Sequence, residues 1–118
     1  MADNHEQELG AANRACSNGE YEKALSILRP MVESEVPGAL GLLGLMYQIG
    51  SGVPQNLTKA VQFLTAAYML GDGTAAHNLG TIYAMGEKEI EKDLGKSKMF
   101  YQKAKEMGAQ FAPDDFYE

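Results

Sequence analysis

The chain has 118 residues, of which 45% are hydrophobic, and its 10 Lys and Arg against 16 Asp and Glu give a formal net charge of −6. This length fits one domain with a folded core, and an acidic balance without a basic run argues against nucleic acid as a partner. The sequence has no run of about 18 apolar residues, so we expect no membrane span. The polar N-terminus and the single cysteine, Cys16, lead us to expect a cytoplasmic protein without an internal disulfide.

The first 35 residues predict a pair of helices. The first helix is expected from about Asn4 to Ser17, with Leu9, Ala12 and Ala15 at helical spacing. A short turn, "SNGEY", leads into the second helix. Alternating apolar and polar runs of the kind that form strands are scarce along the whole chain, so we predict an all-α protein.

The next segment predicts a second pair of helices. Residues Pro37 to Ile49 are apolar almost continuously, with proline where a first helical turn tolerates it and Gly50 where a helix can end. Asn56 is a candidate N-cap for a helix from Leu57 to about Leu70, which stops at Gly71. Because apolar side chains surround the first of these helices, we expect it to be the middle layer of a stack.

A third pair follows the same plan. Thr74 is expected to cap a helix from Ala75 to about Met85, and Asp93 a helix from Leu94 to about Met107. The tail that follows contains three large side chains around Pro113, which blocks simple helix extension. These are Phe111, Phe116 and Tyr117. We expect the tail either to cover the end of the stack or to dock on another copy, forming a homodimer, or on another protein.

Two of these pairs repeat one pattern. "LGLMYQIG" from Leu43 returns as "LGTIYAMG" from Leu79, so the residue numbers differ by 36. In the following helix the offset becomes 37, as from Phe63 to Phe100, which places one extra residue in the connecting loop. Glycine inside a helix costs roughly 1 kcal/mol relative to alanine. The repeated glycines, Gly44 and Gly80, therefore predict a close approach of the neighbouring helix.

The stretch A-x-x-x-L-G-x-x-Y-x-x-G-x-G-V-x-x-N-x-x-K-A, from Ala39 to Ala60, resembles a Sel1-like repeat. The segment from Ala75 to Gly108 is similar, and the first pair of helices resembles the related tetratricopeptide repeat. The resemblance implies a short right-handed α-solenoid of three stacked helical hairpins. We expect a single domain over 1–118, with a tetratricopeptide-like hairpin at 1–35, Sel1-like repeats at 36–72 and 73–108, and a capping tail at 109–118.

The family likeness also implies a function. It favours a non-enzymatic scaffold that holds a partner protein or peptide on the concave face formed by the first helix of each hairpin. The residues expected on that face by repeat position are Asn13, Cys16, Gly41, Leu45, Gln48, His77, Thr81 and Ala84. Met46 and Ile49 are added as apolar residues that we expect to remain partly exposed there.

The sequence contains no pattern that indicates a catalytic site or a metal site. His77 has no second histidine near it, and no Cys or carboxylate lies at ligand spacing on the same helix. Cys16 has no base or orienting group in a recognisable pattern. We therefore predict no catalytic residue, no metal and no cofactor.

Three functions remain open from the sequence. The first is an adaptor or regulatory scaffold. The second is a cytosolic inhibitor, such as an immunity protein that neutralises a toxin, which an acidic and compact chain would suit. The third is a hydrolase or ligand-binding protein for β-lactam or cell-wall compounds, as in relatives with a cysteine pair in each repeat, but Cys16 alone does not match those relatives.

Overall fold

The structure, a computed structural model, describes residues 4–87 and 89–109. Within them it forms six helices and one isolated bridge between Glu87 and Ile90, which confirms the all-α prediction. None of these helices is long and apolar enough to cross a membrane. The helices are α1 (Asn4–Ser17), α2 (Tyr21–Glu33), α3 (Pro37–Ile49), α4 (Leu57–Met69), α5 (Gly73–Met85) and α6 (Leu94–Glu106).

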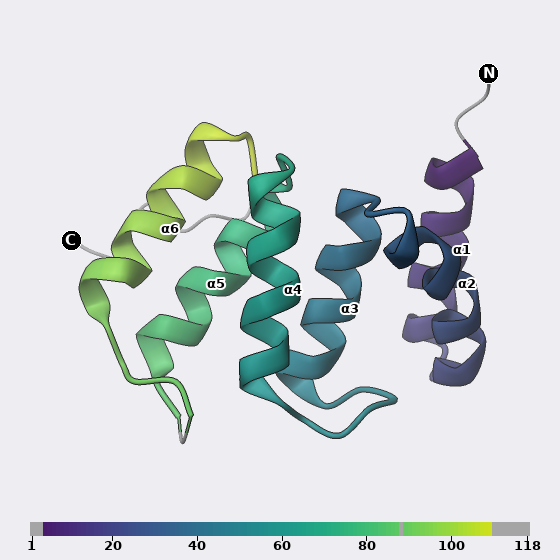
Figure 1. Cartoon of the computed structure of the whole chain (residues 1–118), viewed down its shortest axis with the longest axis horizontal. Coiled ribbons are helices and arrows are strands. Elements are labelled where there is room, and N and C mark those ends of the chain that lie inside the picture. The colour runs from purple at the N-terminus through teal and green to yellow at the C-terminus, as the bar shows by residue number, and fades with distance from the viewer. Residues whose placement is uncertain (1–3, 88, 110–118) are drawn as a thin grey trace.

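The helices pack as three hairpins stacked side by side (Figure 1). Among the described residues, the backbone of α3 closely approaches both α1 and α5, whereas the backbones of α2, α4 and α6 do not approach one another as closely. The contact between α4 and α6 is made by side chains, through Tyr68 and Phe100. The layer of α1, α3 and α5 is therefore the tighter one, and the stack curves around it. This layer is the inner face of the solenoid, and α2, α4 and α6 form its outer layer.

Side-chain caps mark where three of the six described helices begin, namely α4, α5 and α6. Asn56 and Asp93 cap α4 and α6 as predicted, because each side chain accepts a hydrogen bond from the backbone N–H three residues later. The prediction that Thr74 caps α5 is wrong. Asp72 is the N-cap, and its carboxylate accepts hydrogen bonds from the backbone N–H groups of Thr74 at 3.0 Å and Ala75 at 3.4 Å.

The core consists of two apolar clusters that meet at α3. One cluster joins α3, α4 and α5 and includes Leu40, Leu64 and Leu79. The other joins α1, α2 and α3 and includes Leu28 and Met46. Since α3 contributes to both clusters, its apolar side chains are buried from two sides. This confirms the expectation that α3 is the middle layer of the stack.

The glycines inside helices mark close approaches between the two helices of a hairpin. A Cβ atom at Gly44 would lie 2.7 Å from Cγ of Leu64, and one at Gly80 would lie 3.0 Å from ring atoms of Tyr101. Both distances are shorter than ordinary van der Waals contact. A side chain at either position would push α4 or α6 outward, so the predicted reason for these glycines is confirmed.

The second and third hairpins also share an aromatic arrangement. Tyr47 stacks on Phe63 with ring centroids 5.8 Å apart, and Tyr83 stacks on Phe100 at 5.9 Å. A lysine ammonium lies over each tyrosine ring, 5.3 and 5.0 Å from the centroid. The lysines are Lys59 and Lys96. The sequence repeat is therefore a repeat of contacts as well as of helices.

Candidate protein-binding surface

A hollow of about 430 Å³ lies where the C-terminal ends of α3 and α5 meet the loops that follow them. Its walls come mainly from the inner layer of the solenoid, with contributions from the start of α4 and from the loop after α5. The residues that line it are Gln48, Ile49, Gln55, Leu57, Thr81, Ile82, Met85 and Glu87. Its volume falls in the range of about 300–1,000 Å³ that is typical of ligand pockets.

Two large apolar side chains at the hollow remain exposed to solvent. Ile49 is 59% exposed and Met85 is 64% exposed. They occupy equivalent positions in the two repeats, since 49 and 85 differ by 36. The sequence prediction included Ile49 but not Met85. The repeat offset itself was the signal that could have found Met85.

Two of the polar side chains that line the hollow have hydrogen-bond partners, but one side-chain oxygen does not. The hydroxyl of Thr81 lies 2.7 Å from that of Tyr101 and donates to the backbone oxygen of His77 at 3.3 Å. Gln55 donates through Nε2 to the backbone oxygen of Gln48 at 2.8 Å. The side-chain oxygen of Gln48, Oε1, is buried and has no hydrogen-bond partner. This acceptor lies beneath the surface of the hollow, where a bound segment would reach it only if the side chain of Gln48 turned outward.

Charge is nearly absent from this surface. Neither α3 nor α5 contains an Asp, Glu, Lys or Arg. Of the residues that line the hollow, only Glu87 carries a charge at neutral pH. The solvent-exposed face of a helix usually carries charged side chains. An exposed face without them is therefore better suited to contact another apolar surface.

The predicted site residues separate into two groups. Gln48, Ile49 and Thr81 line the hollow and lie together. Leu45 and Ala84 are half-buried on α3 and α5 but are not part of its lining. Asn13 is exposed on α1, where its side-chain amide donates to the backbone oxygen of Leu9 at 3.0 Å. These three residues belong to the inner layer without joining the hollow.

Two predicted residues do not offer a surface at all. Met46 is only 1% exposed and packs in the cluster between the first and second hairpins, so the expectation that it remains partly exposed is wrong. Gly41 is also buried, because the carboxylate of Asp72 occupies the space where a side chain at position 41 would lie. Both residues lie on α3, which packs against neighbouring helices of all three hairpins.

His77 and Cys16 are in packing environments. The ring of His77 lies edge-on to Tyr101, with centroids 5.0 Å apart, and burial lowers the pKa of the imidazole below its ordinary value. The thiol of Cys16 lies 4.0 Å from the sulfur of Met46, and burial raises its pKa, which disfavours the reactive thiolate. Within residues 4–87 and 89–109, no three His, Cys, Asp or Glu side chains come close enough to hold a metal ion.

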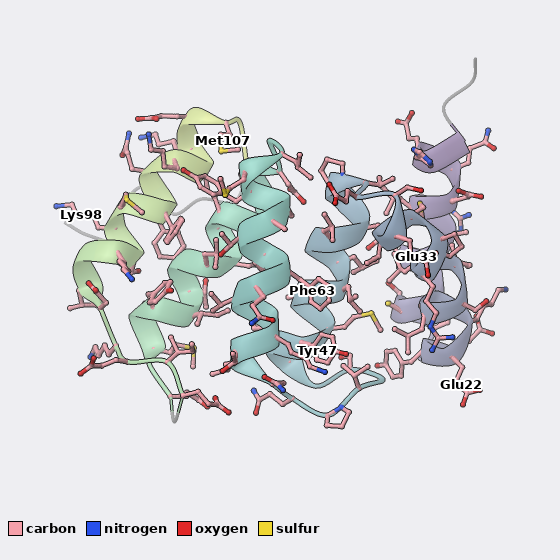
Figure 2. The ribbon with its side chains drawn as sticks, in the orientation of Figure 1. Glu22, Glu33, Tyr47, Phe63, Lys98 and Met107 are labelled. Atoms are coloured by element: carbon pink, nitrogen blue, oxygen red, sulfur yellow. The ribbon has the colours of Figure 1, made fainter. Side chains whose placement is uncertain are left out.

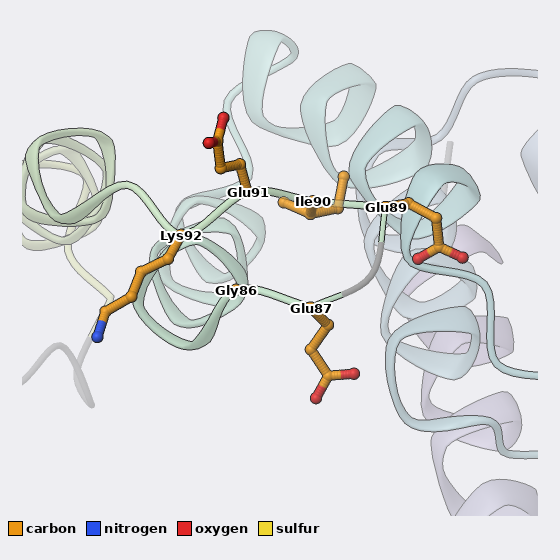
Figure 3. A pocket seen from close by; sticks show the side chains of 6 residues that line it. All are labelled: Gly86, Glu87, Glu89, Ile90, Glu91 and Lys92. Carbon is orange, nitrogen blue, oxygen red and sulfur yellow. The ribbon is translucent and has the colours of Figure 1, made fainter.

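A second, wider hollow of about 530 Å³ is lined by the loop between α5 and α6. Figure 3 shows that the carboxylates of Glu87, Glu89 and Glu91 point in different directions, with Lys92 directed away from them. Two backbone hydrogen bonds of 2.8 Å between Glu87 and Ile90 close the loop. Since its charged groups do not converge, this loop presents an acidic surface rather than a binding site for a small ligand.

The predicted contacts of the tail are not tested by the structure. Phe111, Phe116 and Tyr117 lie outside the described residues, so their expected role in capping or in a homodimer stays a prediction.

Comparison with known proteins places these features in a family. The family model of the Sel1 repeat matches residues 37–72 and 73–108. The curated rat (Rattus norvegicus) protein DAP3-binding cell death enhancer 1 is 28% identical over 98 residues, which is 83% of this chain but 19% of the relative. The chain therefore spans about a fifth of that protein.

Two solved structures share the fold. A Sel1 repeat protein from Oxalobacter formigenes is 30% identical with a TM-score of 0.72, over 81% of this chain and 39% of that one. The protective antigen c5321 of uropathogenic Escherichia coli, which has an SLR fold, is 24% identical with a TM-score of 0.74, over 89% of this chain and 23% of that one. In both cases this chain matches a part of a longer protein. Together with the two matched repeats and the stacked hairpins, they lead to one conclusion: the chain belongs to the Sel1 repeat family.

Proposed function

We propose that this chain is an interaction module that holds a helix or a short extended segment of a partner protein on its inner face, centred on the hollow between α3 and α5. Sel1 repeats generally mediate contacts between proteins, which supports the general role. The name of the rat relative states that it binds DAP3, a further example of protein binding by a protein with a matching segment. The observation that carries the proposal is the pair of exposed apolar side chains on two uncharged helices.

Ile49 and Met85 are suited to be the apolar anchors. They flank the hollow from adjacent helices, and each exposes more than half of its surface. A few well-packed anchors provide most of the energy of a typical interface. The flexible thioether of methionine also adapts to differently shaped partners. A partner segment that inserts one or two apolar side chains between them would remove both from water.

Polar groups around the anchors indicate the rest of the partner's chemistry. The exposed side-chain amide of Gln55 can accept a hydrogen bond from a backbone N–H of an incoming segment. Glu87 is the charged residue of the lining and would favour a Lys or Arg at that end. The proposed ligand is therefore an apolar segment with a basic residue near one end, instead of a strongly charged ligand.

Site-directed photo-crosslinking in the native cell tests this proposal. A photoreactive amino acid would replace Ile49 or Met85 on the inner face, or Met99 on α6 of the outer layer as the control. Met99 is an exposed apolar residue, 45% accessible to solvent, and it lines none of the hollows described for this chain. We expect one discrete product from positions 49 and 85 and none of the same mass from position 99. The same product from position 99 alone would contradict the inner-face assignment.

The identity of the crosslinked protein then separates an adaptor from an inhibitor. If the partner is an enzyme, its activity with and without stoichiometric purified protein is measured directly. If the unmodified protein abolishes the enzyme's activity and the Ile49→Glu variant does not, the chain is an inhibitor that acts through this face. An unaffected enzyme, or a partner without catalytic activity, would assign the adaptor role.

A further inference from the structure

The two junctions between hairpins differ at one equivalent position. In the outer layer, Tyr68 of α4 lies edge-on to Phe100 of the next hairpin, with ring centroids 5.4 Å apart. The residue 36 positions earlier is Val32 of α2, and the partner ring 37 positions earlier is Phe63. The junction between the first and second hairpins therefore has a valine where the other junction has a tyrosine.

The space that a tyrosine would fill at this junction is open. A hollow of about 430 Å³ is lined by Val32, Phe63, Leu40, Ala66 and Leu70, together with Glu35 and Gln62. A second hollow of about 250 Å³ adjoins Val32 on the side of Tyr47, Leu25 and Val53. In Figure 2 the labelled rings of Phe63 and Tyr47 lie over α3, between α4 and α2. The hollow is open to solvent, and its walls are mostly apolar.

We propose that this slot, defined by Val32, Phe63, Ala66 and Leu70, receives a tyrosine or tryptophan side chain from a partner protein. The internal repeat provides the reason for an aromatic occupant, because Tyr68 makes the corresponding contact with Phe100 at the other junction. Edge-to-face ring pairs are favourable beyond the area that they bury. The slot lies on the outer layer, so this site is separate from the hollow between α3 and α5.

The rim of the slot determines the residues that flank the aromatic ring. Glu35, just after the end of α2, is the charged residue among those that line the slot. Gln62 on α4 can hydrogen-bond a phenol or an indole N–H. The carboxylate of Glu35 favours a basic neighbour of the aromatic residue on the partner. The aromatic pair of this chain's own tail, in "PDDFYE", has acidic neighbours instead, which argues against the tail as the occupant.

NMR titration of the 118-residue protein with three synthetic peptides tests the proposal. The probes are acetylated and amidated pentapeptides with the sequences KKYKK, EEYEE and KKAKK. We expect saturable shifts of the Val32, Phe63 and Leu70 signals with KKYKK, weaker ones with EEYEE and none with KKAKK. Absence of a saturable response to KKYKK, or an equal response to KKAKK, would overturn the aromatic assignment.

Two variants place the response at the slot. Val32→Tyr restores the residue of the other junction and is expected to abolish the shifts at Phe63 and Leu70. Gln62→Lys changes an exposed side chain without entering the core, and is expected to weaken KKYKK binding about two- to fivefold by repulsion. An undiminished response in both variants would refute the site. Because Gln62 is on the surface, this readout holds even if Val32→Tyr disturbs folding.

A third variant tests whether the aromatic residues of this chain's own tail occupy the slot instead. In the Phe111→Ala/Phe116→Ala/Tyr117→Ala chain, the response to KKYKK is expected to equal that of the unmodified protein. If the peptide bound only after these changes, the tail would be the natural occupant and the proposed partner would be wrong.

Discussion

The second and third hairpins use the same contacts, whereas the first hairpin packs differently. Both Sel1 repeats have a glycine against the partner helix, a stacked Tyr–Phe pair, a lysine over the tyrosine and a capping Asn or Asp. In the first hairpin, the residue that precedes α2, Glu20, makes no capping hydrogen bond through its side chain. Glu35 also adopts a left-handed backbone with φ of 57° where the repeats have Gly71 and Gly108.

This comparison shows where each part gains its stability. Each Sel1 repeat is held by contacts within its own hairpin that the sequence specifies twice. The first hairpin depends more on the cluster that it shares with α3, to which Met46 contributes a fully buried side chain. We therefore expect substitutions in the repeats to cost more than equivalent substitutions in the first hairpin.

The largest contrast is expected between two helical glycines. Gly44→Val would force side-chain atoms into Leu64, whose backbone nitrogen would be only 3.1 Å from the new Cβ atom. We expect a loss of about 1–3 kcal/mol in the free energy of unfolding, measured by urea denaturation. Gly10→Val in α1 would meet only the flexible end of Arg14 at 3.4 Å and should cost less than about 0.5 kcal/mol. An equal loss of unfolding free energy in the two variants would show that Gly44 is no more important for packing than Gly10.

The two stacked phenylalanines sharpen the comparison of the junctions. Phe100 contacts both Tyr83 and Tyr68, whereas Phe63 stacks on Tyr47 with only Val32 across the junction. We expect Phe100→Leu to lower the free energy of unfolding by about 0.5–1.5 kcal/mol more than Phe63→Leu does, because it loses a second ring contact. Chemical denaturation of both variants side by side measures this difference. A larger loss for Phe63→Leu would mean that the aromatic bridge to Tyr68 adds nothing.

The cap between the repeats provides a pH-dependent test. Asp72→Ala should cost about 1 kcal/mol, because the N–H groups of Thr74 and Ala75 lose their acceptor. Asp72→Asn keeps an acceptor and removes the charge, so it should be neutral or stabilising at pH 7.

The sign of the pH dependence follows from burial. Desolvation raises the pKa of Asp72 above its ordinary value of 3.8, although the two backbone hydrogen bonds oppose the shift. The folded protein therefore binds this proton more tightly than the unfolded chain does, and that contribution to stability is lost as pH rises through the folded pKa. We expect the stability of Asp72→Asn relative to the unmodified protein to be greater at pH 7 than below pH 3.8. The opposite trend in thermal denaturation would show that the hydrogen bonds outweigh desolvation.

The smallest effect is expected at the end of α2. Glu35→Gly should stabilise the protein by about 0.5–1 kcal/mol, since glycine adopts the left-handed conformation without steric cost. Gly71→Ala, at the equivalent position with φ of 102°, should be destabilising by a similar amount. Calorimetry of the two variants checks the pair, and a destabilising Glu35→Gly would indicate that the glutamate side chain contributes a contact of its own.

The sequence predicted the fold well because its signals were repeated. The spacing of Gly44 and Gly80, of Tyr47 and Tyr83, and the caps at Asn56 and Asp93 all recur at a nearly constant offset, so each supports the others. The N-cap of α5 was missed because both Asp72 and Thr74 are good caps, and only the chain direction after Gly71 decides between them.

The binding surface was predicted less completely, for a physical reason. Repeat position gives the approximate direction of a side chain, but burial depends on how far neighbouring hairpins rotate. Met46 and Gly41 are therefore buried, while Gln48, Ile49 and Thr81 line the hollow. Met85 was missed because Ile49 was added for its apolar side chain and not by repeat position, so its equivalent 36 residues later was not included. The hollow beside Val32 could not be predicted, since it arises from the absence of a ring at one junction.

The most direct test of the inner-face assignment is the Kd of the purified complex with the partner found by crosslinking. It compares Ile49→Glu/Met85→Glu on the inner face with Met99→Glu/Met107→Glu, a pair of exposed apolar residues at α6 of the outer layer, away from the slot beside Val32. Circular dichroism first establishes that both variants are folded. We expect the inner pair to raise Kd by about 30-fold or more, as loss of a hot spot of about 2 kcal/mol would, and the outer pair to leave it within about twofold. An unchanged Kd in the inner variant, or a larger loss in the outer one, would contradict the assignment of the hollow between α3 and α5 as the binding surface.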